Sequence, residues 1–372
     1  MARNPDHAMQ ARPTHDERAR QAFIGAYKLH VGRTLRRANR AFFDADTAPA
    51  WAARHGHAPR SAAEIGDAMQ ADPRWQLWSI LQRRGQELMW DAVSETLARE
   101  EPRLRAVHAR LTDPAHRRGS LELDPSVAAP PGIRDTEIHL QPGGYLRDRG
   151  PGDFLAGALY EAGGALYSRA QGVGTGESKG EIIVRFLANR YPGFTPRKIL
   201  DLACSAGASS TPYAEAFPQA EVRAIDVGAG LLRYAHARAE ALGLAVHFHQ
   251  RDAAATGFPD GSFDLVVSHN ALHEMSRETA AAMLAECHRL LRPGGVCVHQ
   301  DVPLRYDQLD EYSKFDYGWD ERYNGEPFWS TYATADLAAM LEGAGFARDR
   351  IYVGLTDQSD RSFRWYVACA RK

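Results

Sequence analysis

Two short stretches in the second half of the chain hold side chains suited to chemistry. SHNALHEM (268–275) contains His269, His273 and Glu274, and HQDVPLRY (299–306) contains His299 and Asp301. A histidine titrates near neutral pH, so His273 or His299 could act as a general base. The three histidines and two carboxylates could instead hold a divalent metal ion, which we favour less because no two of them form a close ligand pair on one helix. The sequence leaves both interpretations open.

An earlier stretch, KILDLACSAGASS (198–210), begins as a buried strand and then breaks into small residues. In a parallel sheet, such a strand-to-helix turn presents free backbone N–H groups to a ligand, and small side chains let that ligand come close. The turn has a single glycine, Gly207, while Ala203 and Ser205 take the other small positions, so it is not the GxGxxG dinucleotide fingerprint. A tight structural turn would explain these residues equally well.

Two acidic residues at the ends of later strands strengthen the case for a ligand. Asp226 ends the strand VRAID (222–226), where its two carboxylate oxygens could accept hydrogen bonds from both ribose hydroxyls of a nucleoside. Asp252 follows the strand VHFHQ (246–250), and with the N–H of Ala253 it suits the edge of an adenine ring. The turn and the two acids together indicate a nucleoside site at the carboxyl ends of the strands.

The elements that would position these residues alternate regularly from residue 178 onward. We expect helices over 178–191, 208–217, 228–242, 277–291 and 334–344, and strands over 198–203, 222–226, 246–250, 263–268, 295–301, 351–356 and 363–370. This alternation predicts an α/β fold with a parallel sheet, right-handed crossovers and helices on both faces. A short loop joins the last two strands, so one of them must run antiparallel.

The first 112 residues have a different pattern. Residues 1–20 are polar and expected to form a flexible N-terminus, whereas 21–112 show helical periodicity. Ser61 is a plausible N-cap of one of these helices, with Glu64 three residues later. Large apolar and aromatic residues recur near helical spacing in 75–97, and we interpret them as core.

Residues 113–150 are rich in Pro and Gly and read as an extended connector with one short strand, EIHLQ (137–141). The connector also carries His139, Gln141, Tyr145 and Arg147. A plain linker would need no such polar and aromatic set, so we expect it to cross the mouth of a site. The chain would then divide into the N-terminus (1–20), a mainly α-helical domain with the connector (21–150) and a second domain (151–372).

Five motifs of the second domain jointly resemble the class I S-adenosylmethionine-dependent methyltransferases: LDLACSAG, AIDVG, RDA, FDLVVSHNALHEM and LLRPGG. The resemblance covers about residues 178–372 and implies a Rossmann-like, seven-stranded sheet with an antiparallel last strand. It implies that S-adenosylmethionine lies across the first four strands and is held by Asp201, Ala203, Cys204, Ser205, Gly207, Asp226, Val227, Asp252, Ala253 and His269. Ala203 and Ser205 replace two usual glycines, and their Cβ atoms narrow the turn but leave its backbone donors.

The segment YEAGGALYSRAQGVGTGE (160–177) occupies the place where this family often folds a segment over the donor. Tyr160 and Tyr167 would lie near the carboxylate or sulfonium end, because aromatic faces attract cations. Ordinary packing of a helix on the sheet would explain the segment as well.

The resemblance implies that the methyl group points toward the loops after the fourth and fifth strands. The protein would then align the acceptor and deprotonate it, with His273 or His299 as the base. The aromatic insertion 306–334 would form a lid over the acceptor, or else a dimer contact. The expected acceptor-site residues are Tyr145, Arg147, Glu274, Asp301, Tyr317, Trp319 and Trp329.

These features predict methyl transfer to a small-molecule acceptor at oxygen, nitrogen or carbon, with S-adenosylhomocysteine as the product. The alternative is a donor-binding protein without transfer, such as a cyclase, an isomerase or a regulatory partner. The fourth-strand loop lacks the Asn/Asp-Pro-Pro-aromatic motif, and the net charge is −2, so a nucleic-acid acceptor is not expected.

Other properties of the sequence bear on the cellular compartment of the protein. No apolar run approaches the roughly 18 residues of a membrane span, and the first residues do not resemble a signal peptide. The four cysteines form no CxxC pair, which fits a reducing cytoplasm. A homodimer is compatible with the exposed aromatics expected in 306–334.

Overall fold

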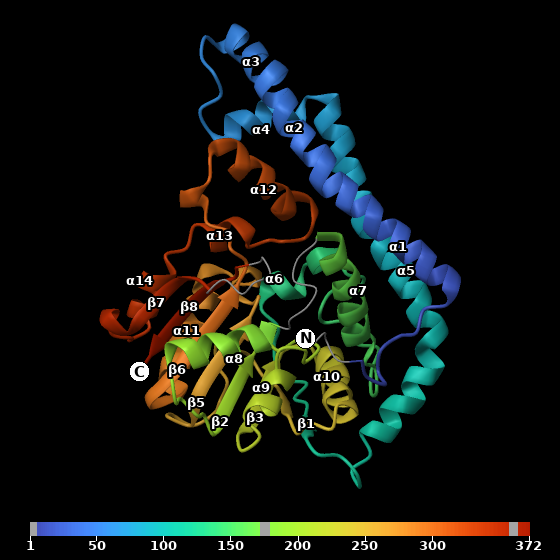
Figure 1. The fold of residues 1–372 in the computed structure, drawn as a ribbon, viewed down its shortest axis with the longest axis vertical. Coiled ribbons are helices and arrows are strands. Elements are labelled where there is room, and N and C mark those ends of the chain that lie inside the picture. The colour runs from blue at the N-terminus through green and yellow to red at the C-terminus, as the bar shows by residue number, and fades with distance from the viewer. Residues whose placement is uncertain (1–5, 172–178, 357–363) are drawn as a thin grey trace.

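The computed structural model describes residues 6–171, 179–356 and 364–372 and is built around one mixed β-sheet (Figure 1). The sheet has eight strands in the order β1-β4-β3-β2-β5-β6-β8-β7. Their bounds are β1 Ser120–Glu122, β2 Lys198–Leu202, β3 Glu221–Asp226, β4 His247–Gln250, β5 Phe263–His269, β6 Leu291–Asp301, β7 Ile351–Leu355 and β8 Tyr366–Arg371. Strand β8 is antiparallel to β6 and β7, and the other neighbours are parallel. The order reverses between β2 and β5, which creates the crevice where such sheets bind ligands.

The α/β fold and the antiparallel last strand are confirmed, but the expected count of seven strands is wrong by one. The additional strand, β1, comes from the connector and pairs with β4 at the edge of the sheet, with Ser120 opposite His247. The Glu240 carboxylate accepts hydrogen bonds from the N–H groups of Arg118 and Gly119, which fixes the approach of β1. Residue 363 of the last expected strand lies outside the described residues.

The prediction of a short strand at 137–141 is also wrong. Residues Ile138–Leu140 form one 3-10 turn, in which His139 and Leu140 have φ values of 54° and 58°. These left-handed conformations are incompatible with an extended strand. Alternating polar and apolar residues suggested a strand here, but the backbone turns back on itself and carries His139 toward the interior.

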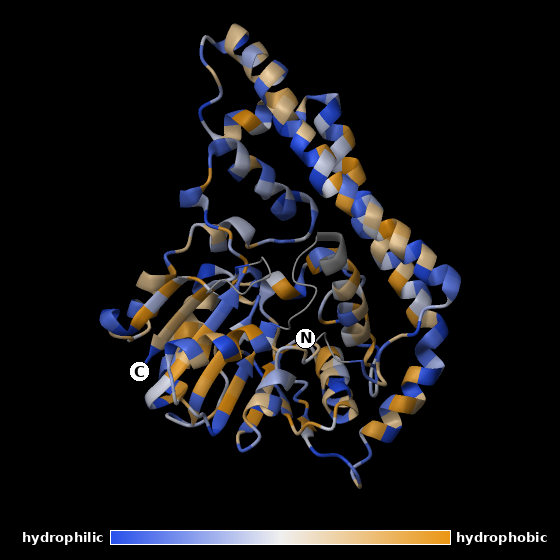
Figure 2. Ribbon diagram, in the orientation of Figure 1, coloured by the Kyte–Doolittle hydropathy of each residue, from blue (hydrophilic) through white to orange (hydrophobic). Residues whose placement is uncertain are grey.

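Helices cover both faces of the sheet because alternate residues of each strand point to opposite sides. One face packs against α8 (Lys179–Arg190), α9 (Thr211–Ala216) and α10 (Ala229–Ala241). The other packs against α11 (Arg277–Leu290), α13 (Trp329–Ala333) and α14 (Leu337–Gly343). Figure 2 shows the apolar strands between these layers. Leu265 and Val267 belong to the first core and Val266 to the second, as period-two alternation requires.

The N-terminal region is helical, as expected, and forms a long antiparallel pair beside the sheet (Figure 1). One arm contains α1 (His15–Leu29), α2 (Arg36–Phe42) and α3 (Ala48–His55), joined by π-helical turns, and the other is α5 (Pro73–Leu111). Helix α4 (Ala62–Gln70), capped by Ser61, contacts α12 (Glu311–Tyr323). The short α6 spans Pro131–Arg134. Large side chains of α5 such as Trp78 and Trp90 are buried, which confirms their interpretation as core.

Part of the stretch expected to be flexible is ordered. Helix α1 begins at His15 because Thr14 forms a capping box: its hydroxyl accepts from the Glu17 N–H, and the Glu17 carboxylate accepts from the Thr14 N–H. Met9 is fully buried. Residues 1–5 lie outside the described residues. Within the described ranges, no helix is both long and apolar enough to cross a membrane.

Helix α7 (Leu155–Gln171) joins the two parts of the molecule, because it packs against α1 and α5 on one side and α10 on the other. Its close approach to α5 depends on Gly163, where a Cβ atom would lie 2.2 Å from a ring carbon of Trp90. The next residue, Gly164, has no neighbour within 4 Å of its Cβ position. Two adjacent glycines of one helix therefore have opposite environments.

We expect Gly163→Ala to destabilise the protein by about 1–3 kcal/mol through overpacking against Trp90. Gly164→Ala should leave stability unchanged or raise it by about 0.5–1 kcal/mol, because alanine favours the helix at an open position. Urea denaturation of both variants beside the wild type measures the difference. Equal effects of the two substitutions would contradict the packing of α7 on α5.

Candidate active site

The turn after β2 contains three residues in the left-handed region of backbone space. Ala203, Ser205 and Gly207 have φ values of 53°, 51° and 75°. A Cβ atom costs roughly 1–2 kcal/mol in this conformation, so Ala203 and Ser205 store strain that glycine would avoid. Gly207 is different, because a Cβ there would also lie 2.9 Å from the Cβ of Ala235. Of these three positions, the one occupied by glycine is the one where a Cβ atom would clash.

The Asp226 carboxylate connects this turn to the end of β3. One oxygen accepts the N–H of Ser205 at 2.9 Å, and the other accepts the N–H of Gly228 at 2.8 Å. Burial raises the pKa of Asp226, while these backbone donors oppose the rise. Each carboxylate oxygen has a second lone pair, so both can still accept from a vicinal diol.

Asp201 and Cys204 lie beneath the turn rather than at its surface. Asp201 is completely buried, and one of its oxygens accepts from the hydroxyls of Ser209 and Ser210 at 2.8 and 2.6 Å. Burial raises its pKa to about 7. The Cys204 N–H donates to the Ile225 carbonyl at 2.9 Å. Both residues thus shape the turn.

Asp252 and Ala253 follow β4, and the two residues that precede them bond the end of β3. The Arg251 N–H donates to the Asp226 carbonyl at 3.1 Å, and the Gln250 amide donates to the Val227 carbonyl at 3.0 Å. The half-buried Asp252 carboxylate accepts from the Ala254 N–H. The structure therefore brings the two acids predicted from the sequence to neighbouring strand ends.

Two tyrosines lead from the turn toward a second group of polar residues. Tyr160 on α7 lies beside Ser205, and burial raises its pKa to about 12, with Ser205 opposing the rise. The ring of Tyr145 meets that of Tyr160 edge to face at 5.7 Å, and its hydroxyl donates to Glu274 Oε1 at 3.1 Å. Tyr167 instead lies 5.7 Å from the His139 ring. Residues 172–177 of the expected cover lie outside the described residues.

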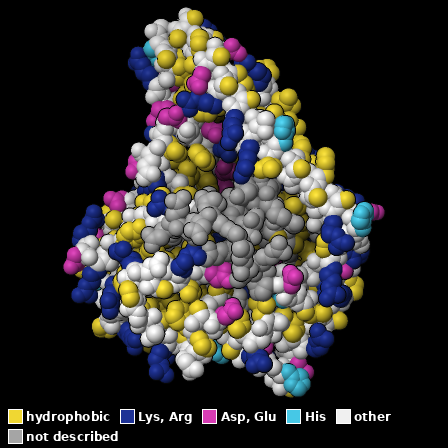
Figure 3. Space-filling view, viewed as in Figure 1, with side chains coloured by type: hydrophobic (Ala, Val, Ile, Leu, Met, Phe, Trp, Pro, Cys, Tyr) yellow, Lys and Arg dark blue, Asp and Glu magenta, His cyan; other side chains and the backbone are white. Residues whose placement is uncertain are grey.

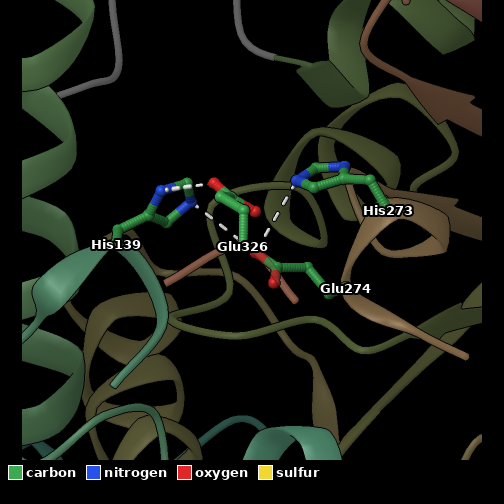
Figure 4. Close-up of side chains that lie close together, drawn as sticks. All are labelled: His139, His273, Glu274 and Glu326. Atoms are coloured by element: carbon green, nitrogen blue, oxygen red, sulfur yellow. Dashed lines mark ion pairs between the residues drawn. The ribbon is translucent and has the colours of Figure 1, made fainter. Parts of the chain in front are cut away.

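Four side chains from three distant segments converge beyond Tyr145: His139, His273, Glu274 and Glu326 (Figure 4). We call them the His–Glu cluster. His139 Nδ1 lies 2.7 Å from Glu326 Oε1, and the Nε2 atoms of His139 and His273 each lie 3.6 Å from Glu274 Oε1. Burial raises the pKa of Glu274 to about 7, with a further rise from Glu326. Sequence reasoning missed Glu326, which sits between α12 and α13 without any spacing signal.

The two histidines proposed as bases have opposite environments. Burial lowers the pKa of His299 to about 4; its Nδ1 bonds the Ser268 hydroxyl at 2.9 Å, and its Nε2 is buried without a partner among the described residues. Burial also opposes the charge of His273, but Asp301, 2.5 Å from its Nδ1, raises its pKa to about 10. Only His299 is neutral at physiological pH in this environment.

The expected metal set of three histidines is not brought together. His269 points to the opposite face of the sheet from His299, where its ring nitrogens bond Tyr213 and Gln300 at 2.9 and 3.0 Å. Neighbouring strand residues alternate between faces, so His269 and Ser268 cannot face the same site. His269 also has no nitrogen left for a ligand.

The expected acceptor-site residues divide into two groups. Tyr145, Glu274, Asp301 and Trp329 gather around the His–Glu cluster, and the Trp329 ring lies 5.4 Å from that of His273. The other three have their contacts elsewhere. Trp319 donates to Ser79 and packs on Trp78, Tyr317 lies under the Arg36 guanidinium, and Arg147 lies against Gly143.

The strain in the turn can be measured directly. Ala203→Gly should raise the thermal midpoint, because glycine removes a left-handed penalty of about 1 kcal/mol. Gly207→Ala should lower it by more, since it adds that penalty and a clash with Ala235. Differential scanning calorimetry checks both, and a stabilised Gly207→Ala would show that the turn has a different conformation.

Comparisons with known proteins bear on this arrangement. Residues 199–295 match the family model of a methyltransferase domain. Demethylmenaquinone methyltransferase from Thermus thermophilus is 39% identical over 108 residues, which cover 29% of this chain and 48% of that protein. Phosphoethanolamine N-methyltransferase 1 from Arabidopsis thaliana is 31% identical over 160 residues, covering 41% and 31%. The chain thus spans less than half the length of these relatives.

Among solved structures, Haemonchus contortus phosphoethanolamine N-methyltransferase 2 in complex with S-adenosyl-L-methionine superposes with a TM-score of 0.40, at 16% identity over 51% of each chain. A similarity this low adds nothing to the sequence matches. The family model covers the turn, both acids and the fourth-strand loop, and the strand order around them is that of an open α/β sheet with an antiparallel last strand. Residues 199–295 therefore match a methyltransferase domain, and they lie on an open α/β sheet.

Proposed function

We propose that the protein binds S-adenosylmethionine at the 203–207 turn and transfers its methyl group to a small-molecule acceptor, releasing S-adenosylhomocysteine. The observation that carries this proposal is the Asp226 carboxylate, which the N–H groups of Ser205 and Gly228 hold at the carboxyl edge of the sheet. In this pose Asp226 accepts from the ribose hydroxyls, and Asp252 with Ala253 contacts the adenine. The methyltransferase family match over the same residues supports it.

The sulfonium end of the donor would lie at Tyr160 and Tyr145. Aromatic faces attract cations, and Tyr160 lies beside the turn while Tyr145 leads to Glu274. The methyl group would then point toward the His–Glu cluster. This direction places the acceptor between Tyr145 and Trp329.

Two features support a small acceptor near that cluster. Figure 3 shows a hollow between the N-terminal helices and the body of the molecule, with acidic side chains in it and Lys or Arg side chains beside it. The segment from α12 to α13 would cover the acceptor through Trp329 and Tyr332, whose rings lie 5.4 and 6.1 Å from that of His273. Relatives are named for a menaquinone precursor and for phosphoethanolamine, so they support a small acceptor without fixing its atom.

His299 is the proposed base, because it is the neutral member of the two candidates and its Nε2 has no hydrogen-bond partner among the described residues. It takes a proton from the acceptor as the acceptor's electron pair forms a bond to the methyl carbon. The carbon–sulfur bond breaks at the same time, and its electrons return to sulfur in S-adenosylhomocysteine. In-line alignment of donor and acceptor provides the remaining rate enhancement.

The donor site is tested by Asp226→Asn, which keeps the size of the side chain but removes its charge. Losing charge-assisted bonds to the ribose, each worth about 1.5–3 kcal/mol, should weaken S-adenosylmethionine binding at least tenfold. Isothermal titration calorimetry measures this, with Asp260→Asn on the exposed β4–β5 loop as the control. An affinity unchanged by Asp226→Asn would overturn the proposed pose.

The base is tested by His299→Gln. Methyl transfer from labelled donor into a low-molecular-weight metabolite extract should fall by about 100-fold or more, while donor affinity stays unchanged. Because burial lowers the pKa of His299 to about 4, its protonation should cause no loss of rate until the pH approaches that value. His57→Gln, between α3 and α4, is the control.

A His299→Gln variant that transfers methyl groups at the wild-type rate would show that His299 is not the base. Donor binding without transfer to any acceptor would instead favour a binding protein of another class.

The proposal also includes the cellular compartment and the oligomeric state of the protein. All four cysteines are free and buried, which supports a reducing cytoplasm. The exposed apolar side chains Phe23, Leu77 and Ile80 on α1 and α5 support a homodimer. Light scattering on the purified chain tests the assembly.

A further inference from the structure

We propose that the His–Glu cluster binds one divalent first-row transition-metal ion, with His139, His273, Glu274 and Glu326 as its protein ligands. One ligand atom from each residue lies within 4.8 Å of all the others. Figure 4 shows the four side chains pointing toward one another from separate segments. Imidazole and carboxylate groups in equal number suit zinc, iron, manganese, cobalt or nickel.

The distances fit a shared ion better than direct contacts between the side chains. At 3.6 Å, the contacts of His139 and His273 with Glu274 are too long for hydrogen bonds. His139 Nδ1 and Glu326 Oε1 form an ion pair at 2.7 Å, which holds both side chains at the cluster. Donor atoms about 2.0–2.2 Å from a common ion lie about 3.0–3.5 Å apart, and the cluster needs only small shifts to reach that arrangement.

A second group of residues holds the ligands in place. Asp301 pairs with Nδ1 of His273, so that Nε2 faces the cluster, where a bound ion would replace the Nε2 proton. Carboxylate–histidine pairs of this kind orient most metal-bound imidazoles. The Tyr145 hydroxyl donates to Glu274 and fixes its carboxylate in the same way.

The backbone at His139 is fixed as well. Two α5 side chains, the Gln86 amide and the Trp90 indole, donate to the His139 carbonyl at 2.8 and 2.7 Å. They support a left-handed conformation at His139 and Leu140, which is costly for residues other than glycine. Strain of this kind persists where the surroundings enforce it, and it concentrates at functional sites.

Without a metal ion, the imidazoles of His139 and His273 are the charge partners of the two cluster carboxylates among the described residues. Glu274 and Glu326 are buried, and one oxygen of each has no hydrogen-bond partner. The described part of the chain supplies neither carboxylate with a Lys or Arg ion-pair partner within 4 Å. Burying carboxylates costs free energy, and a divalent ion would offset that cost with the imidazoles bound to it in their neutral form.

The place of the ion suggests its use. It would lie beyond Tyr145, where the proposed function puts the acceptor, so an acceptor with an oxygen donor could coordinate it. A metal ion lowers the pKa of a bound hydroxyl and thereby eases its deprotonation by His299. This role rests on the proposed methyl transfer, whereas metal binding by the cluster does not.

The test is titration of the full-length, chelator-treated protein with Co²⁺ and Zn²⁺, followed by calorimetry and by the visible absorption of bound Co²⁺. We expect one ion per chain and at least tenfold weaker binding for Glu326→Gln and for His139→Gln. Glu342→Gln on α14 is the matched control and should bind as the wild type does. No binding by the wild type, or equal affinity in Glu326→Gln and Glu342→Gln, would overturn the site.

A second variant covers the case in which Glu326→Gln does not fold. Asp301→Asn keeps all four ligands and should weaken metal binding about 10- to 100-fold, as loss of an orienting partner does; unchanged affinity would count against the site. S-adenosylmethionine titrations of metal-free protein separate the two proposals. If the protein binds the donor but no metal, the proposed function stands and the metal site is wrong. If it binds metal but not the donor, the metal site stands and the proposed function is wrong.

Discussion

The hydrogen bonds to the Asp226 carboxylate are the constraint on which the site depends. They tie the turn after β2 to the turn after β3, through the N–H groups of Ser205 and Gly228. The turn after β2 carries strain at Ala203 and Ser205, and a buried carboxylate with two backbone donors is strong enough to hold it. The same group then remains able to accept from a nucleoside. Asp226 thus supports the turn structurally and is also the residue proposed to recognise the nucleoside.

The N-terminal helices build the wall of the site rather than forming an appendage. Helix α5 places Gln86 and Trp90 against the His139 carbonyl, and α7 places Tyr160 beside the donor turn. The connector contributes both the edge strand β1 and the residues His139 and Tyr145. Packing changes between α5 and α7 would therefore reach the chemistry through the position of His139.

The alternation of strand residues separates two histidine environments. His299 and Asp301 point to the face that holds the His–Glu cluster, whereas His269 and Gln300 point to the other and bond each other. The first face combines a neutral histidine with a cluster of buried acids and imidazoles. On the second face, His269 and Gln300 form a hydrogen bond between β5 and β6.

The sequence by itself determined the alternation of strands and helices from β2 to β6, the tight turn after β2 and the positions of Asp226 and Asp252, because each depends on local periodicity or on a motif at a strand end. It also placed His299 and Asp301 on one face through period-two alternation. Only the tertiary structure decided that His139, Glu274 and Glu326 meet, that β1 extends the sheet, and that Tyr317 and Trp319 turn away toward the N-terminal helices. Those outcomes depend on packing between segments far apart in the chain, for which local spacing carries no signal.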